Sequence, residues 1–142
     1  MEHTATVAVA TDQQRLWRVV ANVEAWPRFV SSMQTVRRRE LGPLGLGSTA
    51  LVKQPGMTPT VWEVTEFDDG RAFVWRSTFP GVTTLGGHVV EADVGGSRLT
   101  LTFRQSGPLA GVVGLIMGRR IRRFLALEAN GLKGAAESPE AA

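Results

Sequence analysis

Residues 109–124 read LAGVVGLIMGRRIRRF, an uncharged run with three glycines that passes directly into a cluster of four arginines. With about 100° of rotation per residue, an α-helix over this stretch gathers its large apolar side chains on one broad arc. Val113, Ile116, Met117, Ile121, Phe124 and Leu127 lie on that arc. We therefore predict a long C-terminal helix, opened by Pro108, that packs its apolar face onto a sheet.

The rest of the chain has mainly the pattern of strands separated by turns. Alternating or β-branched stretches predict strands at 4–10, 35–40, 48–53, 60–67, 71–79, 82–94 and 98–105. Asp68-Asp69-Gly70 and Gly95-Gly96 have the composition of hairpin turns. A capping box formed by Thr11 and Gln14 predicts a helix of about ten residues, and a second short helix is expected at 26–29 around Pro27. The fold class is therefore α+β: a strongly curved antiparallel sheet of about seven strands wrapped around the last helix, with two short helices after the first strand.

Composition restricts the class of protein. A chain of 142 residues fits one domain, which we place at 1–134, with a disordered tail at 135–142. The absence of cysteine excludes disulfides and thiolate chemistry, and a net charge of +3 gives no reason to predict nucleic-acid binding. No secretory signal and no apolar run of about 18 residues is present, so we expect a cytoplasmic protein, monomeric or homodimeric.

Several segments together resemble the START-like, or helix-grip (SRPBCC), superfamily, in its polyketide cyclase/dehydrase-like branch. The resemblance rests on residues 11–17 (TDQQRLW), residues 23–29 (VEAWPRF), Gly47-Ser48, residues 96–100 (GSRLT) and the final helix, and it covers about residues 4–133. It implies a cavity between sheet and helix that holds a small apolar or aromatic molecule. Members include binders, carriers and enzymes, so the fold does not choose among these activities.

His88 is the main candidate for chemistry. Strand alternation puts it in phase with Val90, on the inward side, where an imidazole could act as general acid or base. Glu63 is a candidate partner, although Trp62 and Val64 on the other face make its orientation close to even. Arg120 falls within the apolar arc of the helix and could bind a carboxylate or enolate. The favoured alternative is that its long side chain carries the charge to the exposed end of the helix, or pairs with an acid such as Glu63 or Glu91.

The same reasoning predicts a set of ligand-binding side chains. These are Trp26, Phe29, Trp75, Phe79, His88, Val90, Val113, Met117, Arg120, Ile121 and Phe124. For Trp26 the favoured alternative is a place in the core, and Arg119 and Arg122 fall outside the arc. No metal or cofactor is expected, because the two histidines lack acidic residues at ligand spacing.

Three functions remain open from the sequence. The first is binding of a small hydrophobic ligand, such as a lipid or polyketide. The second is a cyclase, aromatase or dehydrase that uses His88 as acid/base and Arg120 to stabilise an oxyanion. The third is a peripheral lipid or quinone carrier whose C-terminal arginines make weak contact with a membrane surface.

Overall fold

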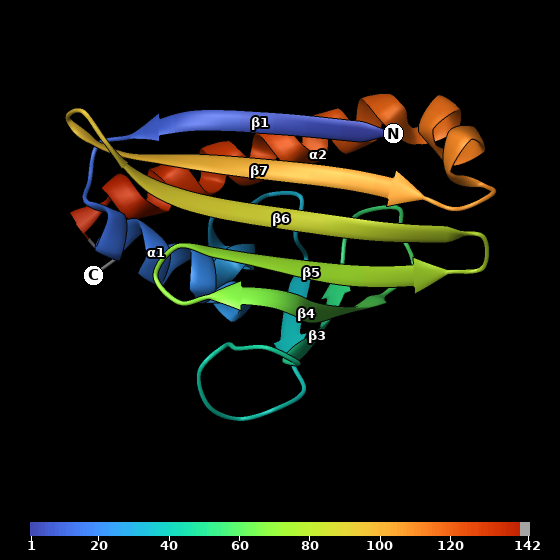
Figure 1. Cartoon of the computed structure of the whole chain (residues 1–142), viewed down its shortest axis with the longest axis horizontal. Coiled ribbons are helices and arrows are strands. Elements are labelled where there is room, and N and C mark those ends of the chain that lie inside the picture. The colour runs from blue at the N-terminus through green and yellow to red at the C-terminus, as the bar shows by residue number, and fades with distance from the viewer. Residues whose placement is uncertain (140–142) are drawn as a thin grey trace.

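The computed structural model describes residues 1–139, which form one bent antiparallel sheet with helices on its concave side (Figure 1). The strands are β1 (Glu2–Val9), β2 (Thr35–Arg38), β3 (Thr49–Lys53), β4 (Thr60–Asp68), β5 (Ala72–Phe79), β6 (Val82–Asp93) and β7 (Gly96–Ser106). The helices are α1 (Gln13–Ala21), the short 3₁₀ helix η1 (Val23–Arg28) and α2 (Ala110–Glu137). This arrangement confirms the predicted helix-grip fold.

The sheet has the order β1-β7-β6-β5-β4-β3-β2 and is not closed into a barrel. Neighbouring strands from β2 to β7 are joined by local connections, and β1 closes the other edge by pairing with β7. Because side chains alternate along a strand, paired inward residues form rows across the concave face. One row is Phe73–His88–Leu101, the next is Trp75–Gly86–Phe103, and the third is Ser77–Thr84–Gln105.

Helix α1 begins one residue later than the capping box predicts. Asp12 is the N-cap, and its carboxylate accepts a hydrogen bond from the Arg15 amide at 2.8 Å. A carboxylate serves this position as well as a hydroxyl does, and its charge favours the positive end of the helix. The predicted role of Thr11 as the cap is therefore wrong. The helix still buries Leu16, Trp17, Val19 and Val20.

Helix α2 extends beyond the predicted domain end. It continues to Glu137, with Ala136 fully buried and its carbonyl accepting a hydrogen bond from Arg15 Nε at 3.0 Å. The expectation of a disordered tail from residue 135 is therefore wrong for residues 135–137, because small alanines allow the last turns to pack against α1. Residues 140–142 of that expected tail lie outside the described residues.

The core fills one end of the fold and leaves the other end open. The fully buried side chains Leu16, Val20, Trp26, Leu99 and Leu132 bring α1, η1, β7 and the second half of α2 together. The first half of α2 covers the opposite end of the sheet less closely, and only Ala110, Gly118 and Ile121 are buried there. No helix within residues 1–139 combines the length and the apolar character needed to span a membrane.

Candidate functional site

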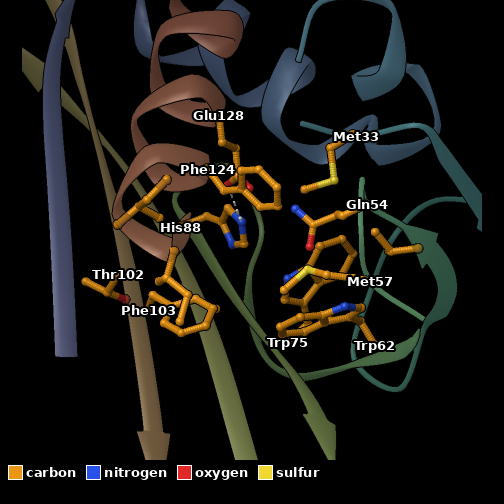
Figure 2. Close-up of a pocket in the computed structure, with 14 residues that line it drawn as sticks. Met33, Gln54, Met57, Trp62, Trp75, His88, Thr102, Phe103, Phe124 and Glu128 are labelled. Atoms are coloured by element: carbon orange, nitrogen blue, oxygen red, sulfur yellow. Dashed lines mark ion pairs between the residues drawn. The ribbon is translucent and has the colours of Figure 1, made fainter. Parts of the chain in front are cut away.

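An inner pocket lies between the concave face of the sheet and α2. Its volume is about 70 Å³, and apolar side chains such as Trp62, Trp75, Phe103 and Phe124 make up most of its wall. Figure 2 shows these side chains converging from β4, β5, β7 and α2. Among the described residues that line it, only two are ionisable, and they are paired with each other.

That pair is His88 from β6 and Glu128 from α2. His88 Nε2 lies 3.3 Å from Glu128 Oε2, and the dashed line in Figure 2 marks this contact. The His88 side chain is 3% exposed and the Glu128 side chain 13% exposed. The imidazole stacks on Phe73 with ring centroids 4.1 Å apart, and Trp26 and Trp75 pack around it. The sheet and helix therefore hold the ring in one orientation.

Both nitrogens of this imidazole face oxygen atoms that accept hydrogen bonds. Nδ1 lies 3.3 Å from the Phe73 carbonyl oxygen, and Nε2 faces the Glu128 carboxyl group. A neutral imidazole has a single N–H, so it cannot donate to a carbonyl and to a carboxylate at once. Both contacts become hydrogen bonds only if the pair holds one further proton, either on the ring or on Glu128. His88 and Glu128 are therefore placed to share a proton.

An outer cavity adjoins the inner pocket and has a volume of about 370 Å³. The two share five wall residues: Val52, Gln54, Met57, Trp62 and Phe103. Among the described residues that line the outer cavity none is charged. The space is within the range of cavities that hold small organic ligands.

The floor of the outer cavity carries a polar row built by the sheet register. Ser77, Thr84 and Gln105 are all buried, and Gln105 Nε2 donates to Thr84 Oγ1 at 3.3 Å. Gln105 Oε1 has no hydrogen-bond partner within residues 1–139. Leaving a buried amide oxygen unpaired is costly, so this row favours a ligand that brings a hydrogen-bond donor. Each space thus has polar groups on its wall, and four of the five wall residues that the two spaces share are apolar, the exception being Gln54.

Gly86 lies in the middle row of the concave face, between the row that contains His88 and the row that contains Thr84. A Cβ at this position would lie 3.0 Å from Trp75 Nε1, because the indole ring covers the glycine. The absence of a side chain at Gly86 thus leaves room for the Trp75 ring, whose centroid lies 5.8 Å from that of His88. Within residues 1–139, no three histidine or acidic side chains come together as a metal site would need.

Most of the side chains that the sequence assigned to the ligand lie around these two spaces. Trp75, His88, Ile121 and Phe124 line the inner pocket, and Phe79, Val113 and Met117 line the outer cavity. Trp26 and Val90 are fully buried in the core instead, and Phe29 packs against that core. Trp26 stands behind His88, with ring centroids 5.5 Å apart, so it supports the imidazole from outside the pocket.

Arg120 and Glu63, the two further candidates for chemistry, both lie outside the two spaces. Arg120 is exposed and lines neither space, and its guanidinium lies beside Gly56 at the rim of the outer cavity. The long side chain carries its charge to water, which avoids the cost of burial. Glu63 is exposed and faces Arg76 at 3.6 Å, so it does not pair with His88. Arg98, rather than Arg120, is the partner of Glu91.

The sequence reasoning missed Glu128, although a signal for it was present. Glu128 follows Phe124 by four residues and Ile121 by seven, so all three share one face of α2. An acidic residue on the most apolar arc of a helix is unusual and indicates a buried partner. The polar row was missed because single polar residues on three strands form a row only once the register is known.

Comparison with known proteins supports the same architecture. A family model described as polyketide cyclase / dehydrase and lipid transport matches residues 1–137. An uncharacterized protein of Mycobacterium tuberculosis strain H37Rv is 27% identical, and the match covers 84% of this chain and 77% of the relative.

Two solved structures illustrate the similarity in fold. A hypothetical protein from Helicobacter pylori has a TM-score of 0.79 at 14% identity, covering 95% of this chain and 86% of the other. The Zhui aromatase/cyclase from a Streptomyces species has a TM-score of 0.71 at 21% identity, covering 96% of this chain and 92% of the other. At such identities the likeness concerns the fold alone.

Proposed function

The chain belongs to the polyketide cyclase/dehydrase and lipid transport family, and from this premise we propose that it binds a small, largely apolar molecule between the sheet and α2. The membership agrees with the resemblance seen in the sequence. Family and fold together support a ligand-binding or cyclase role. Of these two roles we propose ligand binding first and catalysis as a second candidate.

One observation carries the binding function. The inner pocket and the outer cavity are adjacent, mostly apolar spaces, and His88 and Glu128 are the only ionisable side chains among the described residues that line them. Apolar walls supply affinity for a hydrophobic body, and a few polar groups fix its orientation. We expect the ligand to carry an apolar or aromatic body with an oxygen near His88 and a hydrogen-bond donor near Gln105.

Native mass spectrometry of the freshly purified protein tests for a bound molecule directly. Titration calorimetry with β-naphthol, which has an aromatic body and one hydroxyl donor, tests whether the space takes such compounds. Val113→Phe puts a phenyl ring into the outer cavity and should weaken β-naphthol binding by about tenfold, equivalent to about 1.4 kcal/mol. Val112→Phe is the matched control, because Val112 is 55% exposed and does not line the cavity.

Two results would contradict binding in this space. One is the absence of both a co-purified molecule and a heat of β-naphthol binding. The other is equal loss of affinity in Val112→Phe and Val113→Phe, which would indicate a general effect on α2 rather than filling of the cavity.

A second candidate function is dehydration or cyclisation of the bound molecule, and the buried His88–Glu128 pair favours it. In the loss of water from a β-hydroxy ketone, a base removes the α-proton and an acid protonates the departing hydroxyl. Glu128 as carboxylate could take the first proton while His88, doubly protonated, gives one to the hydroxyl. The carbon–oxygen bond breaks, the carbon–carbon double bond forms, and water leaves. The pair keeps its proton count, and transfer from Glu128 to His88 restores the starting state.

The aldol of benzaldehyde and acetone is a suitable probe, because its dehydration gives benzalacetone with a strong ultraviolet absorbance. Under this hypothesis His88→Gln and Glu128→Gln each abolish turnover and leave β-naphthol affinity within about twofold, since the apolar wall is intact. A rate equal to wild type in either variant would overturn the enzymatic role and leave the binding role unaffected.

A further inference from the structure

The outward face of the first turns of α2 exposes large apolar side chains to solvent. Leu115 is 88% exposed, Ile116 76% and Val112 55%. Spacing of about 100° per residue places these three within one arc of the helix, opposite the side that carries Met117 and faces the cavity. Scattered apolar residues on a surface are ordinary, but several on adjoining turns of one face indicate an interaction site.

A cluster of arginines continues the same face. Arg119, Arg122 and Arg123 follow on the next turns within the same arc, and Arg120 projects from its edge. All four are exposed, and none forms an ion pair within residues 1–139. No acidic residue occurs from Val94 to Leu127, so their charge is not balanced along this part of the chain.

The face lies beside the opening of the outer cavity. Leu109, just before α2, is 49% exposed and also lines that cavity, as does Phe79 from the end of β5, which is 49% exposed. In Figure 1 the start of α2 (orange) stands at the same end of the sheet as the β5–β6 turn. Apolar surface therefore continues from the outer face of the helix to the rim of the cavity.

We propose that this outer helix face, Val112, Leu115 and Ile116 with Arg119, Arg122 and Arg123, binds the surface of an anionic phospholipid bilayer. A helix with an apolar stretch and adjacent arginines can lie in the interface, with its apolar side chains among the acyl chains and its guanidinium groups at the phosphates. The charge argues against a second copy of this chain, because the same face of a partner copy offers arginines and apolar side chains but no acidic residue to pair with the guanidinium groups, whereas a bilayer surface offers phosphates. The inference does not depend on what the cavity holds.

Vesicle flotation of the full chain tests this directly. The protein should float with vesicles of phosphatidylcholine and phosphatidylglycerol in equal parts, stay unbound with phosphatidylcholine alone, and be released as salt rises from about 0.05 M to about 0.5 M, where screening is strong. Arg119→Gln and Arg122→Gln should each lower the partition coefficient by about fivefold. Leu115→Ser with Ile116→Ser should lower it by at least about tenfold.

The controls make the same chemical changes elsewhere. Leu46→Ser removes a leucine that is 73% exposed in the loop between β2 and β3, and Arg37→Gln removes an exposed charge on β2. Both should bind like wild type, and circular dichroism should show every variant folded. The proposal is overturned if wild type does not float with anionic vesicles at low salt, or if the face variants float like the controls. It is also overturned if Leu115→Ser with Ile116→Ser abolishes a homodimer in sedimentation velocity while flotation is unchanged.

Discussion

At the scale of single residues, two contacts between a basic and an acidic side chain have similar lengths but different surroundings. His88 and Glu128 are 3.3 Å apart in a buried pocket, whereas Glu63 and Arg76 are 3.6 Å apart on the surface, with side chains about half exposed. Water and salt screen the second pair and reach the first poorly. The energetic coupling between partners should therefore differ, even though the contacts look alike.

A pair of double-mutant cycles measures this difference. We expect His88→Gln and Glu128→Gln to show a coupling free energy of about 1–2 kcal/mol in urea unfolding. The cycle with Glu63→Gln and Arg76→Gln should give at most about 0.5 kcal/mol. Equal couplings in the two cycles would mean that the His88–Glu128 contact is screened as a surface pair is, and would remove the basis for a shared proton.

The sequence could predict the site residues that lie on regular strands and helices. Strand alternation placed His88 and Trp75 inward, and helical phase placed Met117, Ile121 and Phe124 on the cavity side. The same phase was wrong for Arg120, because a long flexible side chain can carry its charge away from the direction of its Cβ. The helical phase of α2 alone could have placed Glu128 on the cavity side. Its contact with His88 could not be predicted, because that contact depends on how α2 crosses the sheet.

At the scale of elements, the turns and the alternation of apolar residues were enough to predict the strands and their order along the chain. The sequence did not decide which side chains of β4 point inward, because each of its two alternating sets contains both apolar and polar residues. The structure has Val64 buried and Trp62 turned to the pocket, and a register shift between Val64 and Glu66 changes the phase further along. A bulge of this kind depends on pairing with β5, so the sequence of β4 alone cannot show it.

The C-terminal turn of α2 provides a prediction about pH. The Lys133 ammonium, which donates a hydrogen bond to Glu137, and then the Ala10 amide hold the pKa of Glu137 below its ordinary value. A lowered pKa in the folded chain means that the carboxylate stabilises the fold above the pKa of the unfolded chain. This contribution disappears as pH falls through the folded value.

We therefore expect Glu137→Gln to lower the free energy of unfolding near neutral pH by no more than about 1 kcal/mol, because the pair is close to solvent. In urea titrations the difference from wild type should shrink as pH falls and vanish in strong acid. Glu66→Gln is the control for the chemical change itself, since the Glu66 carboxylate forms no hydrogen bond within residues 1–139. A loss that grows toward acid would contradict the assigned sign.

At the scale of the whole molecule, the fold has a packed end and an open end. The second half of α2 buries Leu125, Ala129, Leu132 and Ala136 against the sheet and α1, whereas the first half covers the cavity and exposes its outer face. Local opening is cheapest where few apolar contacts are lost. The part of α2 that would admit a ligand is therefore also the least firmly held.

Hydrogen exchange with mass spectrometry tests this division. Amides of residues 112–120 should exchange at least about tenfold faster than those of residues 126–136, because opening them costs less free energy. β-Naphthol at a saturating concentration should slow exchange in the first segment and in β5 and β6 around Ser77 and Thr84. It should leave the pairing of Ala8 on β1 with Arg98 on β7 unchanged, since neither residue lines either space. The contrary result would be uniform exchange along α2, with protection by β-naphthol spread over the whole chain. It would mean that α2 opens only when the whole chain unfolds, and that a ligand enters the cavity without a separate motion of the first turns of α2.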